Sequence, residues 1–141
     1  TQPRLPLLPR GVLHPPDARE ALRQGVDGLV VSNHGGRVLD GAAATALTLP
    51  AIVVAVDGAL PLLVDGGLRQ ATDVPKAPAR GARAVLAGRP VLWGLGPAGA
   101  AGAAHVLRLL RDELELAMAQ CGASTVAELG RDILKPDSAA I

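Results

Sequence analysis

The segment VSNHGGRVLDG, residues 31–41, places a histidine and an arginine three positions apart, with two glycines between them. His34 is a candidate general base, because an unperturbed imidazole has a pKa of about 6.5 and exchanges protons near neutral pH. Arg37 is a candidate anion clamp, because a guanidinium binds a carboxylate through two parallel hydrogen bonds. Together they suggest a site for base chemistry on an anionic substrate. The alternative interpretation is an ordinary turn that holds a loop histidine.

Two later loops combine glycine with arginine. Residues 65–69 read DGGLR, and residues 88–89 read GR. Glycines allow backbone N–H groups to approach a ligand closely, and Arg69 and Arg89 add charged donors, which is what a phosphate group requires. The two loops therefore predict a phosphate site, and the alternative is two tight turns with solvated arginines.

Each of these loops follows a short apolar run, and a run of the same kind precedes Arg10. The runs span residues 5–8, 28–32, 61–64 and 84–87. None alternates with polar residues, which is typical of strands buried on both faces. Helical segments separate the runs, so the sequence predicts an α/β fold with a parallel sheet of βα units. The carboxyl ends of parallel strands share one edge, so the four loops are expected to lie together on the face where such folds place their sites.

The predicted helices cover residues 18–24, a short segment from Thr72 to Gly81, and residues 102–120, with a last short helix begun by the T-x-x-E pattern at 125–128. Residues 42–59 are ambiguous, and Pro50 is expected to break them into two short pieces. The helix over 102–120 is amphipathic. Its apolar face is expected to consist of Ala103, Leu107, Leu110, Leu114, Ala117 and Met118.

Composition narrows the class of protein. A chain of 141 residues is one domain by length, and 49% of its residues are hydrophobic. The net charge of +1 argues against a nucleic-acid partner, and the single cysteine excludes an internal disulfide or a Cys-rich metal site, so no metal is expected. No apolar run approaches the roughly 20 residues of a membrane helix, and no secretion signal is visible, so a cytoplasmic location is expected.

Four other residues receive structural interpretations. His14 is expected in a proline-rich loop and His105 on the surface of the long helix. Cys121 is expected to be a small packed side chain, and Trp93 to lie in the core or at an interface.

Four segments in order, VSNHGGRVLDG, PLLVDGGLRQATDV, AVLAGRPVLWGL and LRDELELAMAQCG, resemble the C-terminal half of the FMN-dependent 2-hydroxy-acid oxidase and dehydrogenase family. That family includes glycolate oxidase and the lactate and mandelate oxidases and dehydrogenases. The resemblance implies a single partial domain over residues 1–141, the C-terminal half of a TIM (β/α)8 barrel, with about four parallel strands, their helices and further C-terminal helices. It also implies FMN as cofactor and oxidation of a small 2-hydroxy acid to the 2-oxo acid.

The resemblance assigns roles residue by residue. His34 matches the catalytic base, and His34 and Arg37 match the substrate-binding pair, with Arg37 gripping the carboxylate. Asp65 matches the aspartate on the ribityl chain of FMN. The full set of positions matched to the cofactor is Arg10, Ser32, Asp65, Gly66, Gly67, Arg69, Gly88 and Arg89.

The sequence also departs from the family pattern. Arg10 stands where the family has a lysine near the flavin ring, and arginine is longer and planar. Pro78 and Arg80 fall in the helix behind the phosphate loop, and Pro78 is expected to weaken that helix and FMN binding. The N-terminal half of the pattern, with its substrate tyrosine, does not occur in this sequence. The alternative function is therefore a truncated, non-catalytic half-barrel that at most binds FMN or self-associates. Open strand edges predict a homo-oligomer or association with the missing half.

Overall fold

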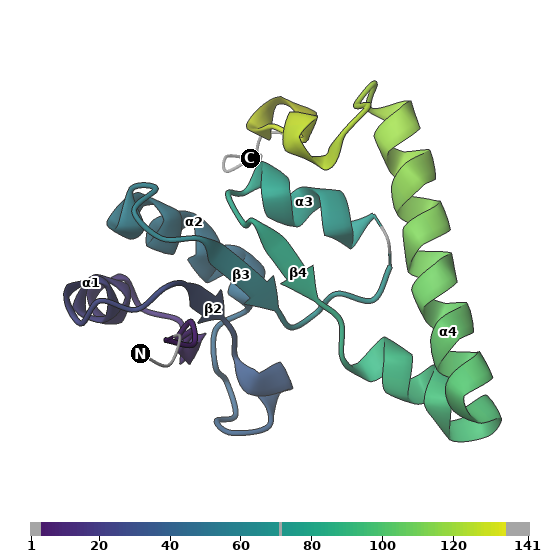
Figure 1. Ribbon diagram of the computed structural model, residues 1–141, viewed down its shortest axis with the longest axis horizontal. Coiled ribbons are helices and arrows are strands. Elements are labelled where there is room, and N and C mark those ends of the chain that lie inside the picture. The colour runs from purple at the N-terminus through teal and green to yellow at the C-terminus, as the bar shows by residue number, and fades with distance from the viewer. Residues whose placement is uncertain (1–3, 71, 135–141) are drawn as a thin grey trace.

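The computed structural model describes residues 4–70 and 72–134. In these residues four parallel strands form one sheet in the order β1-β2-β3-β4 (Figure 1). The strands are β1 (Arg10–Val12), β2 (Leu29–Val31), β3 (Leu62–Asp65) and β4 (Ala84–Leu86). The predicted parallel α/β sheet is thus confirmed, and its sequential order is that of successive right-handed βα units.

Helices follow the strands in turn. They are α1 (Pro15–Arg23), α2 (Thr45–Val56), α3 (Asp73–Ala79) and α4 (Arg89–Gln120), with single 3-10 turns η1 (His34–Gly36), η2 (Val126–Glu128) and η3 (Arg131–Ile133). Helix α1 starts at Pro15, three residues before the predicted start, and ends before Gly25, whose φ of +73° only glycine adopts readily.

The core lies between the sheet and the helices α1 to α3. The two central strands pair in register, with Leu29 opposite Leu62 and Val31 opposite Val64. Most of their side chains are buried, as is the face of α2 that carries Leu49, Ile52 and Val56, whereas the edge strands β1 and β4 consist of half-buried and exposed residues. The prediction of strands buried on both faces therefore holds for the central pair and is wrong for the edges.

The first strand begins later than predicted. Residues 5–8 are not a strand, and β1 begins directly after Pro9. Pro6 and Pro9 have no N–H to donate to a sheet ladder. Instead, the N–H of Leu7 donates to Asp27 Oδ2 at 2.7 Å, and the N–H of Asp27 donates to the carbonyl of Leu7 at 2.9 Å. Residues 5–8 are therefore held in place by the two hydrogen bonds between Leu7 and Asp27 and not by pairing as a strand.

The predicted break at Pro50 is wrong, because α2 is one helix across it. Pro50 cannot donate to the carbonyl of Ala46, four residues earlier. That carbonyl instead accepts a hydrogen bond from Arg80 Nη1 at 3.3 Å. Arg80, which directly follows α3, thus compensates for a proline in α2.

Helix α3 forms in spite of its prolines. Pro75 is its third residue, and Pro78 lies one residue before its end, so only one intrahelical bond, to Val74, is lost near a terminus. Gly81 ends the helix with a φ of +99°. Pro78 therefore leaves the helix formed, and the expected weakening of the helix and of FMN binding stays a prediction.

Helix α4 begins 13 residues before the predicted start, at Arg89 rather than residue 102. Its backbone leaves the helical region at Ala98 and Gly99, so two helical parts join at a bend (Figure 1). Gly94 and Gly102 meet across this bend, where a side chain on either would strike the other's backbone. The glycines and Pro97 disfavour a helix, which is why the sequence did not predict the first helical part, before Ala98. Pro90 is the only buried residue among those described in α4, and the predicted apolar face is half covered at best.

The expectation for Cys121 is wrong, because Cys121 is exposed rather than packed. Trp93 is 60% exposed and therefore not in the core, and its expected place at an interface stays a prediction. The T-x-x-E pattern does begin a turn, η2, in which Thr125 Oγ1 donates to Glu128 Oε1 at 3.0 Å.

Candidate active site

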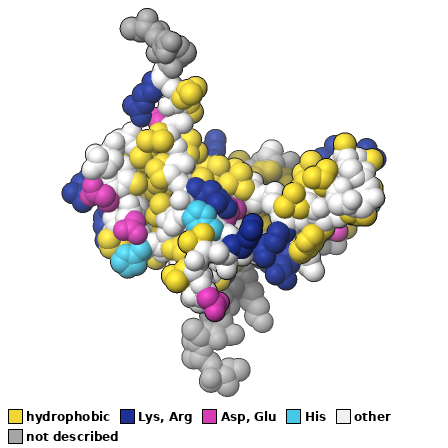
Figure 2. Space-filling model, turned by 90° about the horizontal axis from the view of Figure 1, so that it is seen from below, with side chains coloured by type: hydrophobic (Ala, Val, Ile, Leu, Met, Phe, Trp, Pro, Cys, Tyr) yellow, Lys and Arg dark blue, Asp and Glu magenta, His cyan; other side chains and the backbone are white. Residues whose placement is uncertain are grey.

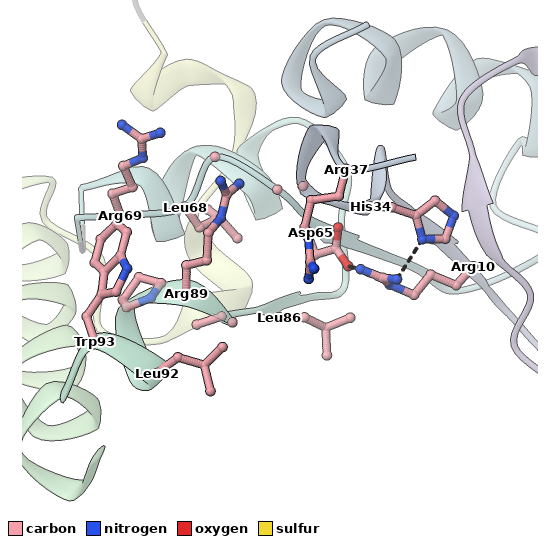
Figure 3. A pocket seen from close by; sticks show the side chains of 16 residues that line it. Arg10, His34, Arg37, Asp65, Leu68, Arg69, Leu86, Arg89, Leu92 and Trp93 are labelled. Atoms are coloured by element: carbon pink, nitrogen blue, oxygen red, sulfur yellow. Dashed lines mark hydrogen bonds and ion pairs between the residues drawn. The ribbon is translucent and has the colours of Figure 1, made fainter. Parts of the chain in front are cut away.

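Arg10 of β1 and the loops after β2, β3 and β4 surround one pocket of about 420 Å3 (Figure 3). All the predicted site residues except Ser32 line it: Arg10, His34, Arg37, Asp65, Gly66, Gly67, Arg69, Gly88 and Arg89. Figure 2 shows basic side chains gathered near a histidine on one face of the molecule, with apolar side chains beside them. The sequence therefore predicted which residues meet. The expectation that Arg10 lies in a loop after a strand is wrong, because Arg10 is the first residue of β1, and only the other residues come from loops.

Arg10 links two other residues at one end of the pocket. Its Nε donates to Asp65 Oδ2 at 2.8 Å, and its Nη2 lies 2.8 Å from the same oxygen. Its Nη1 lies 2.8 Å from His34 Nδ1. Figure 3 shows the Arg10 guanidinium between the carboxylate and the imidazole. A side chain at the first residue of β1 thus reaches past β2 to Asp65, the last residue of β3.

Asp65 presents a buried carboxylate. Its side chain is 11% exposed, and its Oδ1 has no hydrogen-bond donor among the described residues. A buried carboxylate oxygen without a donor is costly. This oxygen can therefore accept one further hydrogen bond from a ligand hydroxyl that reaches it.

The backbone of η1 places His34 beside the pocket. His34 has a left-handed φ of +53°, which is unusual for a residue with a side chain. Its N–H donates to Ser32 Oγ at 3.0 Å, and the N–H of Gly35 donates to Asn33 Oδ1 at 3.0 Å. Ser32 is fully buried, so the structure places it beneath the histidine turn rather than in the pocket. Its predicted contact with the cofactor stays a prediction.

Three other arginines line the pocket. Arg37, Arg69 and Arg89 form no side-chain hydrogen bond or ion pair with any described residue. Arg89 lies across Gly35, where an added Cβ would be 3.2 Å from its Nη2. Since the charges of Arg10 and Asp65 cancel, the pocket carries three uncompensated positive charges. Such a site attracts anions.

The glycine loop after β3 leaves room for a ligand. Gly66 and Gly67 have φ of +87° and +79°. A Cβ on Gly66 would lie 2.8 Å from Asn33 Oδ1, whereas one on Gly67 or on Gly88 would meet no atom within 4 Å. Two of the glycines thus keep open space in a pocket lined by arginines, which is the arrangement a phosphate needs.

Asp73, the first residue of α3, fixes the position of this loop. Its Oδ2 accepts the N–H groups of Arg69 and Gln70, each at 3.2 Å. Partial burial raises the pKa of Asp73, but these bonds and the nearby Lys76 outweigh that effect, so its pKa lies below the ordinary value of 3.8. The carboxylate therefore stays ionised and holds the backbone on which Arg69 stands.

An apolar wall of the pocket was not predicted. Leu68, Leu86, Leu92 and Trp93 line it beside the arginines. The one signal in the sequence was Trp93, the chain's only aromatic residue, four positions after Arg89. A flat apolar ligand group would fit against such a wall.

The donors fit FMN. The arginines and glycines suit its phosphate, the unpaired Asp65 Oδ1 suits a ribityl hydroxyl, and the apolar wall suits a ring system. Over the described ranges, no group of three or more metal-binding side chains occurs. No helix in the same ranges is long and apolar enough to cross a membrane.

Residues 1–136 match the model of a protein family described as FMN-dependent dehydrogenase. The chain belongs to this family. Members of the FMN-dependent dehydrogenase family with similar sequences include the peroxisomal (S)-2-hydroxy-acid oxidase GLO4 of Oryza sativa subsp. japonica, 54% identical over 90% of this chain and 35% of that protein. The L-lactate oxidase of a Roseobacter species is 53% identical over 92% of this chain and 35% of that protein. The mouse 2-hydroxyacid oxidase 1 is 46% identical over 97% of this chain and 37% of that protein.

Solved structures of mandelate oxidase are similar in fold. One, with benzoyl-formic acid, matches 92% of this chain and 38% of its own length, with a TM-score of 0.88 and 48% identity. A mutant holding an FMN adduct matches with a TM-score of 0.87. The fold predicted from the resemblance, part of an FMN-dependent TIM barrel, is thus confirmed, as is FMN as the cofactor. The chain spans about a third of the length of these curated relatives, 35% of the first two.

Proposed function

We propose that this chain supplies the general base, the substrate clamp and the phosphate site of an FMN-dependent oxidoreductase that converts a small 2-hydroxy acid to the 2-oxo acid. The observation that carries the proposal is one pocket in which His34 lies with three arginines that have no partner among the described residues. A phosphate site alone has no need of His34 or Arg37. Relatives named as 2-hydroxy-acid and lactate oxidases support this substrate class.

The charges of the pocket agree with two anionic ligands. Arg37, Arg69 and Arg89 supply three positive charges that no described carboxylate pairs with. A phosphate monoester carries about −1.5 to −2 at neutral pH, and a hydroxy acid carries one carboxylate. FMN and its substrate would together bring the charge of the pocket close to zero.

The residues divide between the two ligands. Arg69 and Arg89, with the glycine backbone at Gly67 and Gly88, would bind the phosphate of FMN, and Asp65 would accept a ribityl hydroxyl. When bound, FMN supplies the acceptor for the two electrons that leave the substrate. Residues of the protein carry out every other step in the proposal.

Arg37 and His34 would act on the substrate. Arg37 would bind the carboxylate through two hydrogen bonds and so orient the adjacent carbon and its hydroxyl. His34, three residues earlier on the same turn, would take the proton that the substrate loses. The similarity to named oxidases does not favour the alternative of a non-catalytic remnant.

We also propose that another chain segment covers the open edges of the sheet. No described strand pairs with the outer edge of β1 or β4, and Leu86 on β4 is 41% exposed. Unpaired strand edges favour association. A second copy or the rest of a barrel would both suit this surface, and sedimentation analysis of the purified chain distinguishes a dimer from a monomer. The cytoplasmic location stays a prediction, and the rice relative is named as peroxisomal.

Titration of the chain with FMN, followed by quenching of flavin fluorescence, tests the cofactor site. Saturable binding is expected, and Arg69→Ala with Arg89→Ala should weaken it at least about tenfold, because each lost charged hydrogen bond is worth about 1.5 kcal/mol or more. Arg83→Ala with Arg108→Ala removes the same charge outside the pocket and is the matched control. Equal losses in the two double variants would refute a specific phosphate site.

Reduction of the bound flavin by 2-hydroxy acids tests the substrate site. His34→Gln should abolish the bleaching of the flavin while sparing FMN binding. Arg37→Met should raise the substrate concentration needed and slow turnover, with little effect on FMN affinity. Bleaching at the original rate in His34→Gln would remove His34 from the role of base.

A further inference from the structure

The bond between Arg10 and His34 defines where the imidazole proton lies. A guanidinium has only donors, so His34 Nδ1, 2.8 Å from Arg10 Nη1, must be the acceptor. A neutral imidazole carries one N–H, which is therefore on Nε2. The lone pair that a base needs is on Nδ1, and Arg10 already occupies it.

The other ring nitrogen does not face the pocket. A Cβ on Gly11 would lie only 2.6 Å from His34 Nε2, so that edge of the ring packs against the backbone of β1. Figure 3 shows one ring nitrogen turned toward Arg10 and the other away from Arg37 and Arg89. In this arrangement His34 offers no free lone pair to a molecule in the pocket.

Asp65 keeps Arg10 in place. Nε and Nη2 of Arg10 both point at Asp65 Oδ2, which leaves Nη1 directed at the imidazole. A planar guanidinium serves both partners at once because its donors point in fixed directions. The side chain of Arg10 is about half exposed, so an acceptor that enters the pocket can reach its guanidinium.

We propose that Arg10 is a positioning residue that holds His34 in the Nε2–H tautomer with its Nδ1 lone pair engaged. His34 becomes free to accept a substrate proton when Arg10 exchanges Nδ1 for another acceptor in the pocket. The consequence for catalysis rests on the proposed function, whereas the state of the imidazole does not. Arg10 thereby couples occupation of the pocket to the readiness of the base.

Chemical modification of the histidines tests this state in the chain without cofactor. Diethyl pyrocarbonate acylates an imidazole nitrogen that has a free lone pair, and mass spectrometry of peptides reports the rate at each histidine. His14 and His105 are exposed and serve as internal references. His34 is expected to react more slowly than either. Arg10→Met should raise its rate about tenfold, the factor that corresponds to about 1.4 kcal/mol for one charge-assisted bond.

Arg37→Met is the matched control, because it removes a positive charge from the same pocket without breaking a bond to the ring. The rate at His34 in this variant should stay within about twofold of the original, since an exposed charge without a contact contributes little. An equal rise in both variants would show a general charge effect and overturn the proposal. So would an unchanged rate in a folded Arg10→Met variant.

A spectrum of the unaltered chain gives a second test that needs no variant. Long-range proton–nitrogen correlation at about pH 8, where an imidazole in a model peptide is neutral, distinguishes the two tautomers. His34 should show a protonated Nε2 and a hydrogen-bonded, unprotonated Nδ1, assigned by the loss of its signals in His34→Gln. A proton on Nδ1, or a spectrum like those of His14 and His105, would refute the bond. FMN binding together with that result would leave the proposed function standing and remove only the role of Arg10.

Discussion

Gly11→Ala is expected to destabilise the chain because it displaces the ring of His34. Gly11 has a φ of +106°, and a Cβ there would lie 2.6 Å from His34 Nε2. Real side chains do not approach so closely, so either the ring or β1 must move. The ring is the softer of the two, and moving it breaks its hydrogen bond with Arg10.

The magnitude has two parts. Holding a residue other than glycine at such a backbone angle costs about 1–3 kcal/mol. Loss of the bond between His34 and Arg10 adds about 1 kcal/mol. The free energy of unfolding should therefore fall by about 2–4 kcal/mol, a large share of what a small domain has.

Urea unfolding followed by circular dichroism measures the loss, and two further variants separate its parts. Gly36→Ala also places alanine at a positive φ, +73°, but with no atom within 4 Å of the added Cβ, so it reports backbone strain near the site without a clash. His34→Ala removes the ring itself. In the background of His34→Ala, Gly11→Ala should cost about 1 kcal/mol less than in the original chain. An equal cost in both backgrounds would refute the packing of the ring on Gly11.

Three other predictions concern the scaffold. Arg80→Met should lower the free energy of unfolding by about 1 kcal/mol, because the carbonyl freed by Pro50 loses its donor, and Pro50→Ala should cancel that loss in urea titrations by restoring a helical N–H. Asp73→Asn should cost about 1–2 kcal/mol near pH 7. Because the folded pKa of Asp73 is lowered, its contribution is present above 3.8 and is lost as the pH falls through the folded value, so melting curves of the variant and the original chain should converge in acid. Ile52→Ala removes a fully buried side chain and should cost about 2–5 kcal/mol. Val54→Ala, on the exposed side of the same helix, should cost little.

Much of the fold could be predicted because it depends on local patterns. Continuous apolar runs followed by glycine loops predict parallel strands, and parallel strands bring the ends of their loops together whatever the side chains are. That rule placed His34, Asp65 and Arg89 on one face from the sequence alone. It holds because backbone geometry, rather than side-chain choice, decides which loops meet.

Other features could not be predicted because they depend on contacts between distant residues. Pro50 reads as a helix breaker, and only the position of Arg80, 30 residues later, shows why α2 continues through it. The surroundings of Trp93 could not be predicted for the same reason: its type suits either the core or an interface, and its place near the start of α4 exposes it to the pocket.

The hydrogen bond that engages His34, the candidate base, could not be predicted from the sequence for a further reason. The sequence identifies an arginine at position 10 and a histidine at position 34, and the shared face of the sheet brings them close. Whether they bond depends on the direction of a long side chain, and that direction is determined here by a third residue, the buried carboxylate of Asp65. A lysine at this position would present one nitrogen, whereas arginine presents Nε and Nη2 to the carboxylate and a separate Nη1 to the imidazole. Arginine at position 10 therefore makes a second contact, and that contact falls on the residue proposed to remove the proton.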